Sequence, residues 1–216
     1  MPLLGKAALL LSFDIAPAAI EEHDDWHTHE HLPERLSIPG FLRGTRWIAV
    51  RGGPRYMVIY EVAELATLSS AAYTQRLDNP SAWTTKMMPH YRGMRRGLCA
   101  VVASAGEGMG YLARALRFTP NPSAADSLEA WLARDLVASL PSRSGIGSAH
   151  LLEGAARAQM TREQSIRGAD AGVNLALIVS GYRDDALAEA FTVDELASRG
   201  AEDITDVTYR IDYSLS

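Results

Sequence analysis

The segment HDDWHTHEHLPERLSIP, residues 23–39, is followed by Gly40 and Phe41 and differs in composition from the rest of the chain. Its first nine positions hold four of the six histidines of the 216-residue sequence. The spacing of its larger residues predicts a helix from about Ala19 to Leu36, which Pro39 and Gly40 end. This helix is the element around which the rest of the first half is arranged.

Working outward, the first half reads strand, helix, strand, strand, helix, strand. The runs rich in apolar, β-branched and aromatic residues predict strands at Ala7–Phe13, Phe41–Val50, Tyr56–Val62 and Leu98–Ser104. A second helical region is predicted at Thr67–Leu77 and, after an Asn-Pro break, at Ser81–Tyr91. The order βαββαβ is that of a ferredoxin-like unit.

The second half of the chain repeats the first after a glycine-rich linker at residues 106–110. Strands or helices matching the first half are expected at Ala113–Phe118, Leu175–Tyr182, Asp184–Leu196 and Val207–Leu215. An extra segment, Ala155–Gly172, contains Thr161 and Gln164 in the spacing of a capping box, which predicts a short helix or a flap. Adding 105 to a residue number carries Leu11 to Leu116, Phe13 to Phe118, Pro17 to Pro122, Trp26 to Trp131, Ser37 to Ser142 and Gly40 to Gly145.

Each ferredoxin-like unit covers one face of its sheet with helices and leaves the other face bare. Two copies in one chain can bury these bare faces against each other. We therefore expect an α+β protein made of two tandem units, residues 1–105 and 110–216, that form a single body with pseudo-twofold symmetry.

Several residues of the first half resemble a known family. The motif comprises Trp26, Glu30-His31-x-Pro33, Arg35 and Pro39-Gly40-Phe41, and Asn79-Pro-Ser-x-Trp83 adds to it. It resembles the EthD-like branch of the dimeric α/β-barrel superfamily, although the second half has no Glu-His-x-Pro element. The resemblance implies a barrel-like pair of sheets and a ligand cavity between helices and sheet. It does not fix a reaction, because that superfamily includes isomerases, lyases, cyclases, cofactor-free monooxygenases and haem proteins.

The two copies of the first helix differ in the residues expected to face the sheet. In the second copy, Leu128, Trp131, Leu132 and Leu136 have the spacing of an apolar stripe. Subtracting 105 places His23, Trp26, His27 and His31 on the same stripe of the first copy. Three imidazoles thus replace three leucines, unless the first helix is rotated so that the histidines face water.

Acid/base catalysis is the function that this stripe favours. Histidine titrates near neutral pH, so His31 and His27, about one helical turn apart, can accept and donate protons. Glu30 is the third candidate catalytic residue because it could raise an imidazole pKa and fix its tautomer, although its match to Asp135 favours a structural role. The candidate substrate-binding residues are His23, Trp26, Tyr60 and His90.

Three functions stay open at this point. The first is a cofactor-independent lyase or isomerase acting on a small substrate, such as an aromatic or cyclic carbonyl compound. The second is a metal or haem enzyme in which His27 and His31 are ligands, completed by His23 or Glu30. The third is a non-catalytic ligand-binding or stress-response module.

Composition narrows the class of partner. A net charge of −5 and a single short basic stretch, Arg92–Arg96, argue against nucleic acid as a partner. No apolar run approaches the length that spans a bilayer, so we expect a cytoplasmic protein without membrane contact. The lone Cys99 fits a reducing compartment and is expected to be a buried apolar residue. The sequence leaves open whether the pseudo-dimer forms a homodimer.

Overall fold

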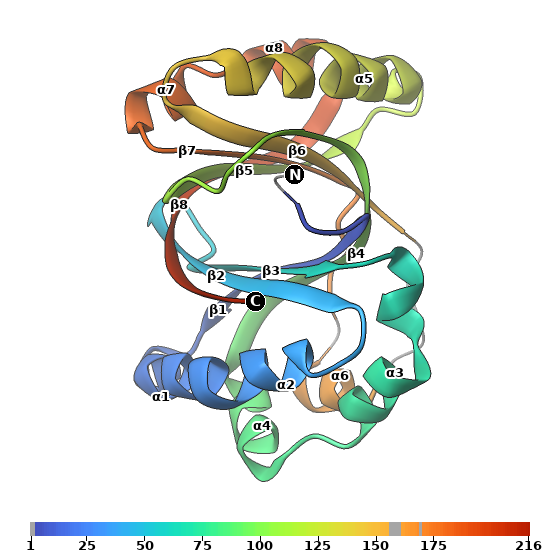
Figure 1. The fold of residues 1–216 in the computed structure, drawn as a ribbon, viewed down its shortest axis with the longest axis vertical. Coiled ribbons are helices and arrows are strands. Elements are labelled where there is room, and N and C mark those ends of the chain that lie inside the picture. The colour runs from blue at the N-terminus through green and yellow to red at the C-terminus, as the bar shows by residue number, and fades with distance from the viewer. Residues whose placement is uncertain (1–2, 156–160, 169) are drawn as a thin grey trace.

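Eight strands form a closed barrel at the centre of the molecule (Figure 1). The structure is a computed structural model, and it describes residues 3–155, 161–168 and 170–216. The order of the strands around the barrel is β1-β3-β2-β8-β5-β7-β6-β4. The strands are β1 (Ala7–Ile15), β2 (Phe41–Arg51), β3 (Tyr56–Val62), β4 (Tyr91–Gly106), β5 (Leu112–Pro120), β6 (Ile146–Gly154), β7 (Leu175–Gly181) and β8 (Ala201–Leu215).

Two seams join the halves of the chain. In each half the first strand lies between the third and the last, so that β1 pairs with β3 and β4, and β5 pairs with β7 and β8. The long last strands then cross over, because β8 also pairs with β2 and β4 also pairs with β6, all antiparallel. Closure leaves no sheet edge unpaired. The expectation of an α+β fold with two tandem ferredoxin-like units is confirmed.

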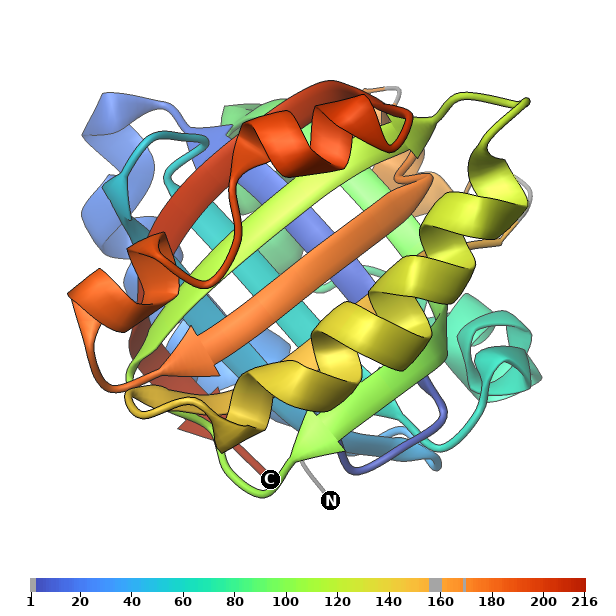
Figure 2. The ribbon, with the colours of Figure 1, turned by 90° about the horizontal axis from the view of Figure 1, so that it is seen from above.

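Helices cover the outer face of the barrel in two layers, one on each side (Figures 1 and 2). The layer of the first half contains η1 (Pro17–Ala19), α1 (Ile20–Trp26), η2 (His27–His31), α2 (Leu32–Leu36), η3 (Leu65–Ser69), α3 (Ala71–Asp78), α4 (Ala82–Met87) and η4 (Met88–His90). The second half contributes α5 (Ala125–Trp131), η5 (Leu132–Val137), η6 (Leu140–Ser142), α7 (Asp184–Ala188) and α8 (Val193–Ser198). One helix of the second half, α6 (Arg162–Arg167), lies instead among the helices of the first (Figure 1).

Three apolar clusters follow from this arrangement. Leu9 and Phe13 of β1 point outward under the first helical layer, whereas Leu10 points into the barrel, as the alternation along a strand requires. The second helical layer packs on Leu116 and its neighbours in β5. Cys99 is buried inside the barrel, as expected from the sequence, and burial raises the pKa of its thiol to about 12.

Several predicted boundaries were wrong. The strand β4 begins at Tyr91 rather than Leu98, because the charged stretch Arg92–Arg96 hides its alternation. The helix expected at Asp184–Leu196 is two short helices, α7 and α8, since the chain breaks at Ala190 to Thr192. The capping box of Thr161 and Gln164 is present at the start of α6. Part of the extra segment, residues 156–160 and 169, lies outside the described residues.

Candidate functional site

The three histidines of the stripe face the sheet. His23, His27 and His31 are 0%, 1% and 6% exposed, and their repeat partners Leu128, Leu132 and Leu136 are equally buried. A rotated first helix with solvated histidines is therefore excluded. His29, between them, is exposed.

A wide helical turn aligns the stripe. In an α-helix a step of four residues overshoots a full turn by about 40°, so residues spaced i, i+4, i+8 drift around the axis. The segment η2 is a π-helical turn, in which the N–H of Leu32 bonds to the carbonyl of His27. Such a turn holds more residues and offsets the drift. The second copy has the same turn at η5, so the feature belongs to the repeated fold and not to the histidines.

The imidazole rings form a column along the helix. The centroids of His23 and His27 are 5.6 Å apart, as are those of His27 and His31, with interplanar angles of 29° and 37°. At one end of the column His31 packs on the ring of Trp26, 4.3 Å away. At the other end His23 contacts Tyr56, 4.8 Å away.

The hydrogen bonds of the column differ from ring to ring. His23 Nδ1 is 3.1 Å from the carboxylate of Asp24, which also accepts a bond from the hydroxyl of Tyr56. The hydroxyl of Tyr60 is 3.3 Å from His27 Nε2. His27 Nδ1 has no partner among the described residues, and neither ring nitrogen of His31 has one there. Since buried polar atoms are normally paired, the Nδ1 atoms of His27 and His31 are the buried unsatisfied groups of the site.

Burial keeps the imidazoles of His27 and His31 neutral. It lowers the pKa of His27 and His31 well below the usual 6.5, and the positive charges of Arg35 and Arg46 lower that of His27 further. Burial also raises the pKa of Tyr60 well above 10, so its hydroxyl stays protonated. Near neutral pH the site therefore holds neutral imidazoles beside a protonated phenol.

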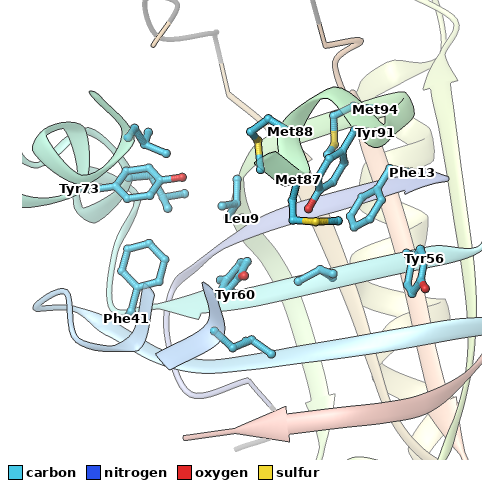
Figure 3. Close-up of a cluster of buried hydrophobic side chains, with 14 of the residues drawn as sticks. Leu9, Phe13, Phe41, Tyr56, Tyr60, Tyr73, Met87, Met88, Tyr91 and Met94 are labelled. Atoms are coloured by element: carbon cyan, nitrogen blue, oxygen red, sulfur yellow. The ribbon is translucent and has the colours of Figure 1, made fainter. Parts of the chain in front are cut away.

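A small cavity opens beside the column, between the helical layer and the sheet. Its volume is about 30 Å³, which is room for one or two water molecules. His27, His31 and Tyr60 line it. One part of its wall is apolar and aromatic, where Leu9 and Phe13 of β1 lie opposite Met88 and Tyr91 (Figure 3). The rest of the wall is polar or charged and includes Arg35 and residues of α6.

Comparisons with known proteins add a statement about the fold. No protein-family model matches the chain, and no curated protein matches it. Among solved structures, an anthrone oxidase-like protein is similar with a TM-score of 0.61 at 13% identity, covering 100% of this chain and 95% of its own. A candidate monooxygenase from Fusobacterium nucleatum has a TM-score of 0.65 at 7% identity, covering 98% and 95%. Another from Lactobacillus acidophilus has a TM-score of 0.61 at 10% identity, covering 97% and 95%.

The chain has the dimeric α/β-barrel fold. Here both halves of the barrel belong to one polypeptide, which confirms the resemblance at the level of the fold. Among the described residues, no helix of this barrel is both long and apolar enough to cross a membrane.

Two of the predicted site residues lie elsewhere in the barrel. The carboxylate of Glu30 accepts hydrogen bonds from Trp26 Nε1 at 3.1 Å and from Ser81 Oγ at 2.5 Å, and so ties the first helix to α4. It points away from the imidazoles, because the residue before His31 lies on another side of the helix. His90 is half-buried at the end of η4 and does not line the cavity. Neither Glu30 nor His90 lines the cavity in this structure.

Trp26 and His23 support the site without lining it. Trp26 is fully buried and packs against His31, and His23 adjoins His27 in the column. Tyr56 and Tyr60 both face the helices, as the alternation of β3 requires.

A buried ion pair closes the cavity, and sequence reasoning missed it. Arg35 is 2% exposed and donates to Glu163 Oε1 at 2.6 Å, with Glu34 as a second partner at 3.1 Å. Burial alone would lower the pKa of Arg35, but Glu163 raises it above the usual value. Because Glu163 belongs to α6, the second half of the chain covers the pocket of the first (Figure 1). The only signal in the sequence was the capping box, which predicted a helix but not its position.

The histidines of the stripe are not arranged as the ligands of one metal ion. Among the residues that the structure describes, no three His, Cys, Asp or Glu side chains are placed to hold one ion. The imidazoles are arranged side by side in a column rather than around one point, and Glu30 is bonded elsewhere.

Proposed function

We propose that this chain is a cofactor-independent enzyme that removes a proton from a small, largely apolar substrate in the helix–sheet cavity, with His31 as the base. The observation that carries the proposal is the pair of neutral imidazoles, each with an unpaired Nδ1 among the described residues, in a pocket that joins an aromatic wall to the ion pair of Arg35 and Glu163. A helix selected only for packing would carry the leucines of the second copy at these positions. The proposed substrate is an aromatic or cyclic carbonyl compound, which suits the aromatic wall.

His31 is favoured over His27 because its lone pair is not engaged. The Tyr60 hydroxyl lies 3.3 Å from His27 Nε2, and in the tautomer we propose it donates there, which occupies that lone pair and leaves the proton on Nδ1. His27 is then a donor, suited to hold the substrate or return a proton, whereas His31 keeps one free lone pair. In the step we propose, the C–H bond of the substrate breaks, its proton moves to His31, and its electron pair delocalises onto the carbonyl oxygen as an enolate.

Arg35 is proposed to stabilise that enolate. It lines the cavity one helical turn beyond His31, and its guanidinium is excluded from water. Positive charge placed where negative charge develops contributes strongly to catalysis in such surroundings. The same charge disfavours a protonated His31 before the reaction, which keeps the base available.

Entry of a substrate requires α6 to move. A cavity of about 30 Å³ accepts water but not a carbonyl compound of useful size. Displacing α6 breaks the bond between Arg35 and Glu163, and so exchanges the carboxylate of Glu163 for the substrate oxygen. In this proposal the ion pair holds the empty site closed.

Deuterium exchange tests the proton-transfer step without knowledge of the product. Cyclic and aromatic carbonyl compounds with acidic C–H groups are incubated with the protein in D₂O, and loss of the C–H signal is followed by ¹H NMR. We expect His31→Gln to lower the exchange rate by about 10² or more, the usual contribution of a general base. His29→Gln, an exposed change on the same helix, is the matched control and should keep the wild-type rate.

Equal exchange rates in wild-type protein, His31→Gln and His27→Gln would refute this function. Thermal unfolding of each variant verifies that the fold is kept.

The fate of the enolate decides the reaction class. Reprotonation at another carbon gives an isomerase, and departure of a leaving group gives a lyase; neither needs a further reactant, so we propose this class. The two bacterial structures of the same fold are named as monooxygenases, and an enolate can also react with O₂. Oxygen uptake measured beside the exchange assay separates the two outcomes.

A further inference from the structure

Two arginines lie at one mouth of the barrel, on the inner face of the sheet and therefore away from the histidine pocket. Along β4, Cys99 points into the barrel, and the same alternation brings Arg95 to the inner face at the rim. Along β5, Ala113 and Ala115 point inward, and Arg117 continues the series. The pairing becomes irregular directly beyond each arginine, as is common at barrel rims beside sites.

Both arginines line the same two cavities, of about 260 Å³ and 440 Å³. Asp14 lines the larger cavity, and its repeat partner Thr119 lines the smaller one. The cavities thus occupy corresponding places in the two halves, with Arg95 and Arg117 shared between them. Each is far larger than the pocket beside the histidines.

The charge of this pair is not neutralised within the described residues. The buried arginines Arg35, Arg46 and Arg114 each donate to a carboxylate. Neither Arg95 nor Arg117 forms an ion pair or side-chain hydrogen bond with any residue that the structure describes. Arg117 Nη1 is fully buried without an acceptor. Burial lowers the pKa of Arg117, and the nearby charge of Arg95 lowers it further.

Two more unpaired donors lie on the inner face near this mouth. Ser12 of β1 lies directly opposite Arg95 of β4, and both Ser12 and Trp47 lie opposite Met57 of β3. Residues opposite each other on paired strands share a face of the sheet, so Ser12, Trp47 and Arg95 are on the same face. Ser12 Oγ and Trp47 Nε1 are buried and have no partner. Five buried side-chain atoms of the described residues lack a partner, and these two with Arg117 Nη1 are the three outside the histidine column.

We propose that this mouth of the barrel binds a small oxyanion, the carboxylate or phosphate group of a small molecule, between Arg95 and Arg117. An oxyanion supplies the acceptor that the buried Arg117 Nη1 lacks, and its negative charge offsets the repulsion between Arg117 and Arg95, whose side chain is exposed. The planar fork of arginine matches both groups through two parallel N–H bonds. Arg55 adds positive charge to the larger cavity, where Asp14 is the one carboxylate among its lining residues.

Calorimetric titration with inorganic phosphate and with acetate, at matched ionic strength in chloride, tests the site. We expect at least one of the two anions to bind saturably to the wild-type chain. The anion that binds more tightly shows whether the site prefers a phosphate or a carboxylate group. Arg95→Gln and Arg117→Gln should each weaken binding at least about tenfold, equivalent to ~1.4 kcal/mol. The affinity of Arg117→Lys, which keeps the positive charge but not the planar fork of donors, should lie between the affinities of Arg117→Gln and the wild-type chain. Arg134→Gln, at an exposed position on the second helical layer, is the charge-matched control.

A second readout needs no variant of the arginines. The indole N–H resonance of Trp47, assigned by its loss in Trp47→Phe, should shift with phosphate or acetate along the calorimetric saturation curve. No saturable binding of either anion to the wild-type chain, or equal affinity in the double variant Arg95→Gln/Arg117→Gln, would overturn the proposal. The assay uses no substrate, so its result is independent of the proposed proton transfer.

Discussion

Replacing His27 and His31 by leucine should remove much of the acid sensitivity of this protein. The double change gives the first helix the residues of its repeat partner, Leu132 and Leu136, which occupy equivalent buried positions. It therefore exchanges two buried titratable rings for apolar side chains that this fold is known to accept at the same turn.

The direction and size of the effect follow from the lowered pKa values of the two imidazoles. Below the usual pKa of 6.5 an unfolded histidine takes up a proton, whereas buried His27 and His31 stay neutral until the pH reaches their much lower folded values. Stability is thus fully present above 6.5 and falls as the pH drops from there toward the folded pKa. Between pH 7 and pH 5.5 each histidine costs about 1.3 kcal/mol of unfolding free energy, and the pair about 2.5 kcal/mol.

Urea unfolding at pH 7.0 and 5.5 measures this difference. The wild-type chain should lose at least about 2.5 kcal/mol over this interval, and the leucine variant should lose that much less. In thermal unfolding the same difference corresponds to a change of about 5–10 °C in the pH shift of Tm. The variant will keep some pH dependence, because burial also lowers the pKa of His23, and that of His150 to about 4.

His29→Leu, which changes an exposed histidine of the same turn, is the control and should keep the wild-type slope. If the double leucine variant and the wild-type chain lose the same free energy between these pH values, the two imidazoles are not held neutral by burial. The basis of the proposed catalytic site would then fail as well.

Three further changes test other parts of the structure. Glu30→Gln should lower the unfolding free energy by about 1–3 kcal/mol in urea titrations, because Glu30 joins α1 and η2 to α4. The variant should still exchange substrate deuterium at the wild-type rate; loss of exchange in a folded variant would restore a catalytic role to Glu30. Glu163→Gln should speed tryptic cleavage within α6, because Arg35 loses its charged partner on that helix. Glu195→Gln, which removes an exposed ion pair, is the control and should leave the cleavage rate unchanged. An unchanged rate in Glu163→Gln would mean that the Arg35–Glu163 pair does not hold α6 in place. Gly44→Ala should lower the unfolding free energy by about 1–3 kcal/mol in the same urea titrations, because the added Cβ would lie 2.2 Å from a methyl carbon of Leu32 in α2. Wild-type stability in this variant would show that α2 can move away freely.

The internal repeat made the fold and the orientation of the stripe predictable. The sequence of the first helix alone could not show whether His27 and His31 face the sheet or the solvent, because its apolar residues do not mark one face clearly. The leucines 105 positions later resolved this, since two copies of one fold bury the same side of the same helix.

The pocket itself was less predictable because its decisive contacts are distant in sequence. Arg35 and Glu163 are 128 residues apart and belong to different copies, so no spacing rule relates them. The orientation of Glu30 depends on Ser81, on a helix whose position is set only by the folded chain. The π turn was equally hidden, since the π-helical pairing leaves no clear mark in the composition of His27–His31.

The two copies divide the tasks of one fold between them. The second copy fills its helix–sheet layer with Leu128, Leu132 and Leu136, and so buries apolar area at no polar cost. The first copy holds imidazoles at the same places, with unpaired Nδ1 atoms on His27 and His31 that each cost about 1–3 kcal/mol. Such a cost persists in proteins chiefly where the strained or unsatisfied groups serve a function. The second copy then contributes α6 to the wall of the cavity beside those rings and pairs Glu163 with Arg35 there. The unsatisfied nitrogens of the first copy and the closing helix of the second are therefore best understood as two parts of one site.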